Sequence, residues 1–338
     1  MANKVVTFGE VMMRLSAPGF ARFVQSNAFD VTYGGGEANV AVSLAQFNMP
    51  AAHVTRFPDN ELGRAATNLM RKYGVDTQHI VYGGNRLGLY FLETGASVRA
   101  SKVIYDRAGS SFADLQPDMI DWEQALEGAS WFHWTGITPA ISEGAAASCK
   151  RAIEVANSKG ITVSADINYR KNLWQYGKKA SDVMPDLISG CDIIVSGKSD
   201  AKDILKITSK ESDEEASYMD VFGQIMERFP KVKKIVNTTR GSISASHNTL
   251  SGMLYDGKQL LHTTTYDINP IVDRIGGGDA FMAGLIYGML TYQNDQKALD
   301  FGVAASVLKH SILEDANLAT VEEVETLLAG DTSGRLQR

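Results

Sequence analysis

A chain of 338 residues can fold as one large α/β domain or as two domains of ordinary size, and either can bury a sizeable core. The composition, 44% hydrophobic and 21% charged, is typical of a globular protein. The net charge of −6 argues against a basic surface for nucleic acid or for an anionic membrane, so we expect neither as a partner. Any phosphate-binding site must therefore be local.

The two cysteines, Cys149 and Cys191, lack the C-x-x-C spacing of zinc and redox sites. We expect both to be buried and reduced, as in a cytoplasmic protein. The N-terminal segment MANKVVTFGEV leads directly into a strand pattern without a signal sequence. No run approaches the ~20 apolar residues of a membrane span. The prediction is a cytoplasmic protein that is neither secreted nor membrane-spanning.

Helical and strand periodicities alternate along most of the chain from about residue 37. Gly74 is expected to close one of the helices. Strands that alternate with helices indicate βαβ units, and we therefore predict an α/β fold whose mostly parallel sheet is covered on both faces. The expected helices span 37–47, 61–74, 143–160 and 181–190, and the expected strands span 51–57, 161–167, 191–197 and 233–239.

Residues 87–109 break this alternation, with two period-2 runs around a glycine-containing turn. They predict a β-hairpin, to which segments 12–18 and 29–35 could add two short strands. We expect a small sheet that projects from the α/β body and forms a lid from about 12–35 and 86–109. Parallel pairing is not expected there, because a parallel sheet needs crossover helices and none fits in this region.

The segment DRIGGGDAFMAG places three glycines before an aspartate at the start of an apolar helix. Glycines let the backbone turn sharply, so several first-turn N–H groups can point at one spot, where the helix dipole favours an anion. Asp279 could accept the proton of a hydroxyl that attacks a phosphoryl group, while the amides of Gly276, Gly277 and Gly278 stabilise the transferred phosphate. The alternative is an ordinary aspartate in the first turn of a helix.

A second glycine cluster, YGGGEANVAV at residues 33–42, also precedes a helical pattern. Three interpretations stay open: a loop that requires positive φ, a ligand cradle, and a dinucleotide-binding fingerprint. The dinucleotide interpretation is weak, because Asn39 stands where G-x-G-x-x-G needs its third glycine and the preceding FDVTY is too polar for a central parallel strand. We interpret Asp59, some twenty residues further on, as a coincidence.

A third cluster comprises Tyr90, Tyr105 and Arg107. On a strand, Tyr105 and Arg107 share one face, and the hairpin could bring Tyr90 across from them. Tyrosine offers a hydroxyl above an apolar ring, and arginine offers a planar fork for a carboxylate. Arg170 lies just beyond the C-terminal end of a predicted strand, where open α/β sheets bind ligands. The alternatives are ordinary aromatic packing and solvated arginines.

Together these motifs make the chain resemble the ribokinase-type (PfkB) carbohydrate kinases over nearly its whole length. The family's C-terminal signature, D-T-x-G-A-G-D before a small-residue helix, is similar to DRIGGGDAFMAG, and its N-terminal signature, G-G-x-x-x-N-x-A, is similar to GGGEANVA. The two lie about 240 residues apart, in the family's order. Within the family, GLYFLE, YDRAGSSFADL, WTGITPAIS and DINYRKNLW look most like 2-keto-3-deoxygluconate kinases.

The resemblance implies one ribokinase-like domain over 1–330, a three-layer α/β/α sandwich with a β-sheet lid, and a flexible tail at 331–338. It also implies ATP-dependent phosphorylation of the 6-hydroxyl of 2-keto-3-deoxygluconate, with magnesium and, as a further option, a monovalent cation. Asp279 would be the general base, and the amides of Gly276 to Gly278 the anion hole. Lids of this family often pair between subunits, so a homodimer through the lid is expected.

The resemblance further implies two sets of binding residues. An acid sugar needs a cation for its carboxylate, and Arg107 and Arg170 stand in matching places. The expected substrate-binding residues are Gly34, Gly35, Asn39, Tyr90, Tyr105, Arg107, Ile137, Arg170 and Asp315. The expected nucleotide-binding residues are Asn168, Arg170, Ser196, Thr239, Gly241, Ser244, Gly276 and Gly278.

The chain also departs from the family pattern. Arg274 and Gly277 replace the usual threonine and alanine of the C-terminal signature. Ser199 stands where a magnesium-associated glutamate belongs. Either the adjacent Asp200 substitutes for it with a small shift, which makes Asp200 the expected metal residue, or the metal is held more weakly than in the family. Three other functions stay open: a fructokinase or another sugar kinase of the same family, a catalytically silent sugar-acid sensor favoured only by the missing glutamate, and a nicotinamide dehydrogenase.

Overall fold

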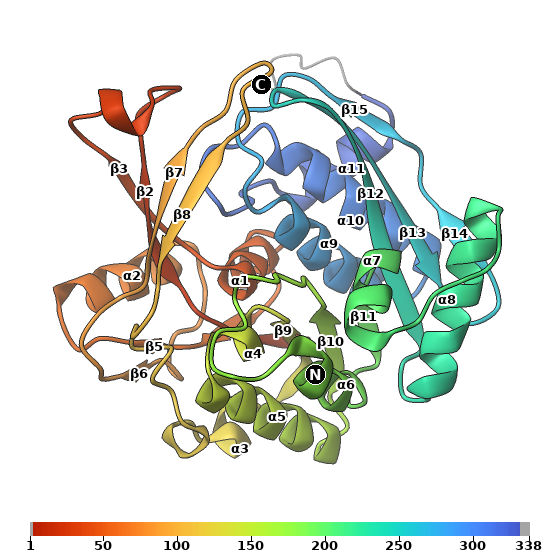
Figure 1. Cartoon of the computed structure of the whole chain (residues 1–338), viewed down its shortest axis with the longest axis horizontal. Helices are drawn as coiled ribbons and strands as arrows, with labels where there is room; N and C mark the ends of the chain where they lie inside the picture. The colour runs from red at the N-terminus through yellow and green to blue at the C-terminus, as the bar shows by residue number, and fades with distance from the viewer. Residues whose placement is uncertain (1–2, 332–338) are drawn as a thin grey trace.

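A central sheet organises the computed structural model, which describes residues 3–331 (Figure 1). Within these residues the sheet has nine strands in the order β14-β13-β12-β11-β10-β9-β1-β4, with β15 beside β13. The six strands β4, β1, β9, β10, β11 and β12 run parallel to one another, and β13 runs antiparallel to its neighbours. The predicted mostly parallel sheet is confirmed. Its strands are β1 (Lys4–Phe8), β4 (Ala51–Val54), β9 (Ala129–Thr135), β10 (Thr162–Asp166), β11 (Ile193–Val195), β12 (Lys234–Ser244), β13 (His247–Tyr255), β14 (Leu260–His262) and β15 (Tyr266–Ile268).

Helices cover both faces of this sheet, which gives three layers. Neighbouring strand residues point to opposite faces, and Val5 and Val6 of β1 accordingly join separate apolar clusters, both fully buried. The Val6 cluster contains α3 (Trp122–Ala125), α5 (Glu143–Ser158), α6 (Ala180–Ile188) and α8 (Glu214–Arg228). The Val5 cluster contains α1 (Gly36–Gln46), α2 (Glu61–Lys72), α9 (Gly277–Tyr292), α10 (Asp295–Lys309) and α11 (Val321–Leu328). Two short helices, α4 (Thr138–Ile141) and α7 (Lys198–Asp200), follow β9 and β11.

A separate four-stranded sheet, here called the small sheet, stands at the upper left of Figure 1. The predicted hairpin is confirmed, since β7 and β8 pair antiparallel with Tyr90 opposite Tyr105. The expectation that no strands would pair in parallel is wrong, because β2 and β7 do so. Their connection, residues 17–88, passes through the α/β body and supplies the crossover. The strand order is β3 (Asp30–Gly34), β2 (Met12–Ser16), β7 (Leu89–Glu93) and β8 (Lys102–Asp106).

The dinucleotide interpretation of residues 33–42 is not supported by the fold. The strand before the glycines, β3, is an edge strand of the small sheet rather than a central parallel strand. Asp59 forms an exposed ion pair with Arg64.

The expected strand 51–57 divides between two sheets, because its last two residues form β5 (Arg56–Phe57), which pairs with β6 (Val81–Tyr82).

Other expectations concern the thiols and the ends of the chain. Cys149 and Cys191 are free and fully buried, and Gly74 ends α2 with φ of +85°, both as predicted. The predicted tail at 331–338 lies outside the described residues, except for Asp331. Within residues 3–331, no helix combines the length and the apolar character that a bilayer span requires.

Candidate active site

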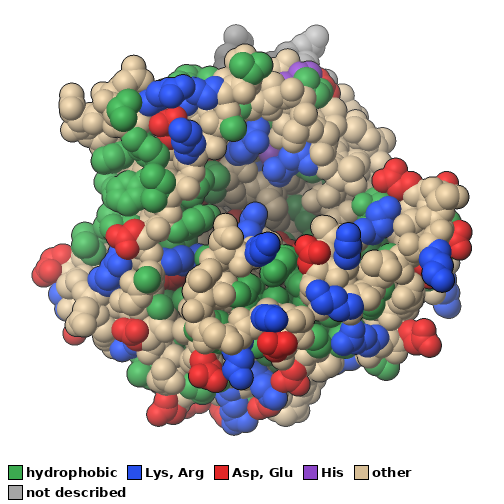
Figure 2. Space-filling model, viewed as in Figure 1, with side chains coloured by type: hydrophobic (Ala, Val, Ile, Leu, Met, Phe, Trp, Pro, Cys, Tyr) green, Lys and Arg blue, Asp and Glu red, His purple; other side chains and the backbone are tan. Residues whose placement is uncertain are grey.

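A cavity of about 460 Å³ lies where the first turn of α9 meets the small sheet and the C-terminal ends of the central strands. Figure 2 shows it as a hollow in the face of the molecule, with lysine and arginine side chains around it. Most residues predicted for the site line this cavity: Gly34, Gly35, Asn39, Tyr90, Tyr105, Arg107, Ile137, Asn168, Arg170, Ser196, Asp200, Gly276, Gly277, Gly278, Asp279 and Asp315.

Three residues predicted to bind nucleotide do not line the cavity. Thr239, Gly241 and Ser244 all belong to β12. Thr238 and Arg240, the strand neighbours of Thr239 and Gly241, line it instead, since alternate residues of a strand face opposite sides. Ser244 lies beyond a register shift that follows Ser242. The nucleotide contacts of the three stay a prediction.

The first turn of α9 provides unpaired amides beside the cavity. Gly276 caps the helix with φ of +82°, and a Cβ at this position would lie 1.8 Å from the carbonyl oxygen of Asp315. Both the left-handed backbone conformation and the lack of space therefore exclude a side chain at Gly276. The amide of Gly277 makes only a long 3.4 Å bond to the oxygen of Arg274, and first-turn amides have no partner within a helix. These amides, with the helix dipole, can receive an anion.

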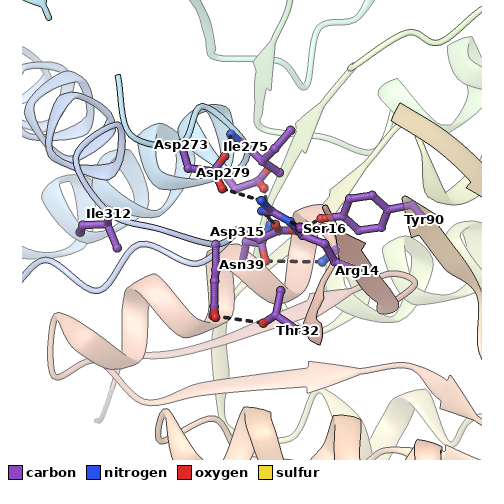
Figure 3. A network of polar contacts seen from close by, with 12 residues as sticks. Arg14, Ser16, Thr32, Asn39, Tyr90, Asp273, Ile275, Asp279, Ile312 and Asp315 are labelled. Carbon is purple, nitrogen blue, oxygen red and sulfur yellow. Dashed lines mark hydrogen bonds and ion pairs between the residues drawn. The ribbon is translucent and has the colours of Figure 1, made fainter. Parts of the chain in front are cut away.

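Asp279 lies in this same first turn and is bonded to the other glycine-rich segment. Asn39 Nδ2 donates a 2.7 Å hydrogen bond to Asp279 Oδ2 (Figure 3). Burial raises the pKa of Asp279 to about 7, although the Asn39 hydrogen bond opposes the rise and the nearby Asp166 carboxylate adds to it. A carboxyl with a pKa near neutrality, at a cavity wall, is suited to accept a proton.

A second carboxyl of similar character stands at the end of β10. Burial raises the pKa of Asp166 to about 7, and the charge of Asp200 contributes to the rise. The orientation of the Asp200 side chain is fixed by a 3.1 Å hydrogen bond, which its Oδ2 accepts from the amide of Gly197. Both carboxyls line the cavity. Across residues 3–331, however, no three His, Cys, Asp or Glu side chains are grouped so that they could hold a metal ion by themselves.

A buried arginine joins three parts of the chain beneath the cavity. Arg14 of β2 pairs with Asp273 through Nη2 at 2.6 Å and with Asp315 through Nη1 at 2.5 Å (Figure 3). All three side chains are at most 7% exposed. The hydroxyl of Tyr90 also donates to Asp315. Asp315, expected to bind substrate, is held in the cavity wall by these partners.

The glycines before α1 are required by close packing rather than by positive φ. A Cβ on Gly34 would lie 2.1 Å from Asp315 Oδ2, and one on Gly35 would lie 2.0 Å from the carbonyl oxygen of Glu10. Neither has positive φ, so the interpretation of a positive-φ loop is wrong. Gly34 therefore allows Asp315 to approach the small sheet, and Gly35 allows the backbone of Glu10 to approach the start of α1.

Arg107 is not the free cation that the sequence suggested. Its Nε donates to Glu10 Oε2 at 2.8 Å and its Nη2 lies 2.5 Å from the same oxygen. Ser110 also donates to Glu10, at 2.5 Å. The pairing leaves Nη1 of Arg107 for a ligand. The guanidinium lies over the ring of Tyr105, with Cζ 5.8 Å from the ring centroid. Glu10 therefore orients Arg107 at the cavity wall.

Another buried carboxylate, Glu37 of α1, lines the cavity and was missed from the sequence. Its Oε1 accepts hydrogen bonds from the amide of Thr135 at 3.0 Å and from the hydroxyls of Thr135 and Thr138 at 2.8 and 2.7 Å. Burial raises the pKa of Glu37, and these bonds oppose the rise. The saturated Oε1 suits a structural role, in which Glu37 ties α1 to the end of β9.

Comparison with known proteins agrees with this geometry. The model of the pfkB family of carbohydrate kinases matches residues 2–312. The chain belongs to this family. It is 30% identical over 334 residues to a 2-dehydro-3-deoxygalactonokinase of Haloferax volcanii, with 99% of each chain covered. A solved 2-dehydro-3-deoxygluconokinase of Thermotoga maritima is 43% identical, with a TM-score of 0.93 and coverage of 98% of this chain and 99% of that one.

The fold is ribokinase-like, as predicted. A putative ribokinase II of E. coli, solved with ATP and Mg²⁺, superposes with a TM-score of 0.80 over 97% of this chain and 99% of that chain. Its identity of 18% shows the likeness of fold alone.

Two departures of this carbohydrate kinase from its family signature have visible structural correlates. At Gly277 a Cβ would lie 2.8 Å from Cε1 of His310, so the alanine that the signature usually has would collide with this ring. The ring is fixed by a 2.7 Å contact between Nδ1 and the carbonyl oxygen of Ser306. Arg274, in place of threonine, donates from Nη2 to the carbonyl oxygen of Ala245 at 2.9 Å.

The cavity of the kinase also holds residues that sequence reasoning did not select. Asp166 follows the strand-end rule that found Arg170, and that rule could have found it. Two buried residues outside the cavity lining, Arg14 and Lys309, had no local signal, since Arg14 lies in an ordinary strand pattern and Lys309 in an apolar helix. The missed residues that line the cavity with polar or charged side chains are Glu10, Glu37, Asp166, Asn237, Thr238, Arg240 and Arg274.

Proposed function

We propose that this protein transfers the γ-phosphoryl group of ATP to the 6-hydroxyl of 2-keto-3-deoxygluconate, giving 2-keto-3-deoxy-6-phosphogluconate and ADP. The observation that carries the proposal is the position of Asp279, a carboxyl with a raised pKa in the same helical turn as unpaired amides and on the wall of one cavity. The names of the two relatives described above support a sugar acid as the acceptor.

In this mechanism Asp279 accepts the proton of the 6-hydroxyl as its oxygen attacks the γ-phosphorus. The bond between that phosphorus and the bridging oxygen breaks, and ADP leaves. The amides of Gly276 to Gly278 stabilise the charge on the transferred group. Asn39 holds the carboxylate of Asp279 in place through its 2.7 Å hydrogen bond.

Recognition of the acid group would fall to two arginines. Arg107 presents its remaining Nη1, because Glu10 occupies Nε and Nη2. Arg170 lines the same cavity, and no carboxylate of the described residues pairs with it. Since the charge of Arg107 is balanced by Glu10, Arg170 would contribute most of the net positive charge. Gly34, Gly35, Tyr90, Tyr105 and Ile137 would surround the rest of the sugar.

Magnesium fits two carboxyls of this chain. The ion is usually bound through one or two carboxylates together with substrate phosphates, rather than by an all-protein cage. Asp166 and Asp200 both line the cavity and lie close enough for one charge to raise the pKa of the other group. Bound there, magnesium would neutralise phosphate charge. We expect these two carboxyls, and not Ser199, to hold it.

A monovalent cation stays a prediction from the resemblance. The ammonium of Lys309, fully buried, donates to the carbonyl oxygen of Ile312 at 3.0 Å and lies 3.5 Å from that of Asp273. Carbonyl oxygens of this kind would also be the ligands of a monovalent cation, but the ammonium of Lys309 already occupies these two. The proposed mechanism therefore does not require such an ion.

The small sheet would act as a lid that excludes water during transfer, and as a dimer contact. An apolar row crosses its outer face in register, from Val31 through Leu15 and Phe91 to Ile104. Val31 and Ile104 are each 55% exposed. Figure 2 shows hydrophobic side chains gathered over this sheet. A homodimer in the cytoplasm is the expected form.

The decisive experiment is a substrate panel with ATP and magnesium, in which ADP release is measured for 2-keto-3-deoxygluconate, fructose and ribose. We expect a strong preference for the acid sugar, and we expect Arg170→Ala to reduce kcat/KM for it without a matching loss for neutral sugars. A preference for fructose would replace the proposal with a fructokinase. Binding of the acid sugar without any ADP release would identify a silent sensor.

A further inference from the structure

Two arginines on one wall of the cavity lack the carboxylate partners that the other wall provides. On the small-sheet side, Arg14 pairs with two aspartates and Arg107 pairs with Glu10. On the opposite side, among residues 3–331, no acidic group lies within ion-pair distance of Arg240 or Arg274. Figure 1 shows the small sheet and β12, which carries Arg240, on either side of α9.

Arg274 is held rigidly but keeps free donors. Its Nη2 donates to the carbonyl oxygen of Ala245 at 2.9 Å, and the oxygen of Ser244 lies at 3.5 Å. This anchor fixes the guanidinium between the signature loop and the β12–β13 turn. Nε and Nη1 have no partner within the described residues, and the side chain lines the cavity. A guanidinium has five N–H donors, so several remain for a ligand.

Arg240 stands beside Arg274 and is open to the cavity. Burial against the wall, and then repulsion by the Arg274 charge, lower the pKa of Arg240. The nearby His310 is not a counter-ion for the two arginines. Burial lowers the pKa of its ring to about 4, so the ring is neutral at pH 7. Two like charges side by side without a counter-ion are unfavourable in the empty cavity and become favourable when an anion binds between them.

We propose that Arg240 and Arg274 form a clamp for the polyphosphate of the phosphoryl donor. This inference rests on the proposed function for the identity of the donor as a nucleoside triphosphate. Arg240 belongs to β12 and Arg274 is anchored on Ala245 in the β12–β13 turn, whereas Tyr90 and Tyr105 belong to the small sheet, so we assign the two guanidinium groups to the phosphoryl donor rather than to the sugar. Planar guanidinium groups bind phosphate oxygens through paired hydrogen bonds.

The clamp is tested by nucleotide binding in the absence of sugar. Affinities for ADP and for adenosine are measured by calorimetry on the full-length protein and on Arg240→Gln, Arg274→Gln and Arg274→Thr, the last restoring the residue that the family signature usually has. Each variant should lose at least about ten-fold in ADP affinity, the scale of one charge-assisted hydrogen bond, with adenosine affinity unchanged. Arg240→Lys, which keeps the charge but not the fork, should lose less.

Arg64→Gln, in an exposed ion pair on α2, is the matched control and should bind ADP as the parent protein does. Thermal unfolding of each variant separates misfolding from loss of contact. Unchanged ADP affinity in both glutamine variants would overturn the clamp, and so would a loss that is equal for ADP and adenosine. If no sugar is phosphorylated but the variants lose ADP affinity selectively, the clamp stands and the proposed reaction fails.

Discussion

Asn39 and Asp279, 240 residues apart in the sequence, share a hydrogen bond of 2.7 Å that joins the two glycine-rich segments. The bond stabilises the charged form of Asp279, so it opposes the rise in pKa that burial causes. Asn39→Ala should move the acid limb of the kcat/KM profile to higher pH by about one to two units, since a hydrogen bond to a charged group contributes ~1.5–3 kcal/mol.

The measurement for Asn39→Ala is kcat/KM between pH 5 and 9. Activity at pH 7 should fall about 5- to 50-fold and recover as the pH rises toward 9, because Asp279 then loses its proton in the variant as well. Gln46→Ala, at the end of the same helix and bonded only to the carbonyl oxygen of Tyr73, serves as the control. An acid limb that does not move would disprove the electrostatic role of Asn39.

Asp279→Asn should lower turnover by about 10²–10⁴-fold, because the base is lost while its shape is kept. It should also raise the melting temperature at pH 8. The pKa of Asp279 is raised to about 7 in the folded protein, so the folded state holds a proton that the unfolded chain has released between about pH 4 and 7, and stability falls as pH rises through that window. The gain should vanish near pH 4. An equal gain at both pH values would contradict the assigned pKa.

The two glycines directly before Asp279, Gly277 and Gly278, should respond differently to alanine. Gly277→Ala places a Cβ 2.8 Å from the His310 ring and should destabilise the fold by ~1–3 kcal/mol. Combining it with His310→Ala should recover part of that loss, as a double-mutant cycle in urea would reveal. At Gly278 a Cβ meets nothing within 4 Å, so Gly278→Ala should fold normally but lose turnover by obstructing the anion hole.

Replacing Arg14 should affect stability far more than its place in an ordinary strand suggests. Arg14→Met leaves Asp273 and Asp315 buried without their cation, at a cost of ~3–5 kcal/mol in the free energy of unfolding. The exposed pair of Arg64 and Asp59 is the comparison, because Arg64→Met should cost less than ~1 kcal/mol. Guanidinium unfolding of both variants measures the difference, and similar midpoints would refute the buried network.

Pairing through the small sheet predicts a specific sensitivity to charge. Ile104→Asp introduces a carboxylate at the end of the apolar row and should convert a dimer into a monomer. Light scattering after size-exclusion chromatography measures the mass. Leu62→Asp, at a position 48% exposed on α2, should leave the mass unchanged. A dimer that survives the Ile104 substitution would place the contact elsewhere.

The periodicity of the chain was sufficient to predict the layers of the fold. Runs such as 161–167 and 191–197 became β10 and β11, because buried parallel strands need apolar residues on both faces. The pairing of β2 with β7 could not be predicted, since strand patterns carry no information about which distant strand lies alongside. The glycine signature was sufficient to predict the start of α9 and the place of Asp279 in its first turn, because both depend only on neighbouring residues of the sequence.

What the sequence could not reveal were the partners of charged groups. Arg107 had the pattern of a free cation, yet Glu10, whose segment gave no sign of a site, orients it. Arg274 was noticed only as a departure from a signature, and its lack of a carboxylate partner became visible only in three dimensions. Ion pairs between residues far apart depend on the completed fold, so local residue patterns do not specify them.

The Arg14 network has a consequence for the order of synthesis. Its two carboxylates follow Arg14 by 259 and 301 residues, so a ribosome completes nearly the whole protein before the arginine can be neutralised. A nascent chain that stops before Asp315 can form early elements such as α1 and β4, but it cannot close the wall of the cavity. The cavity is therefore assembled at the end of translation, and truncated chains would carry all the early sequence without a complete site.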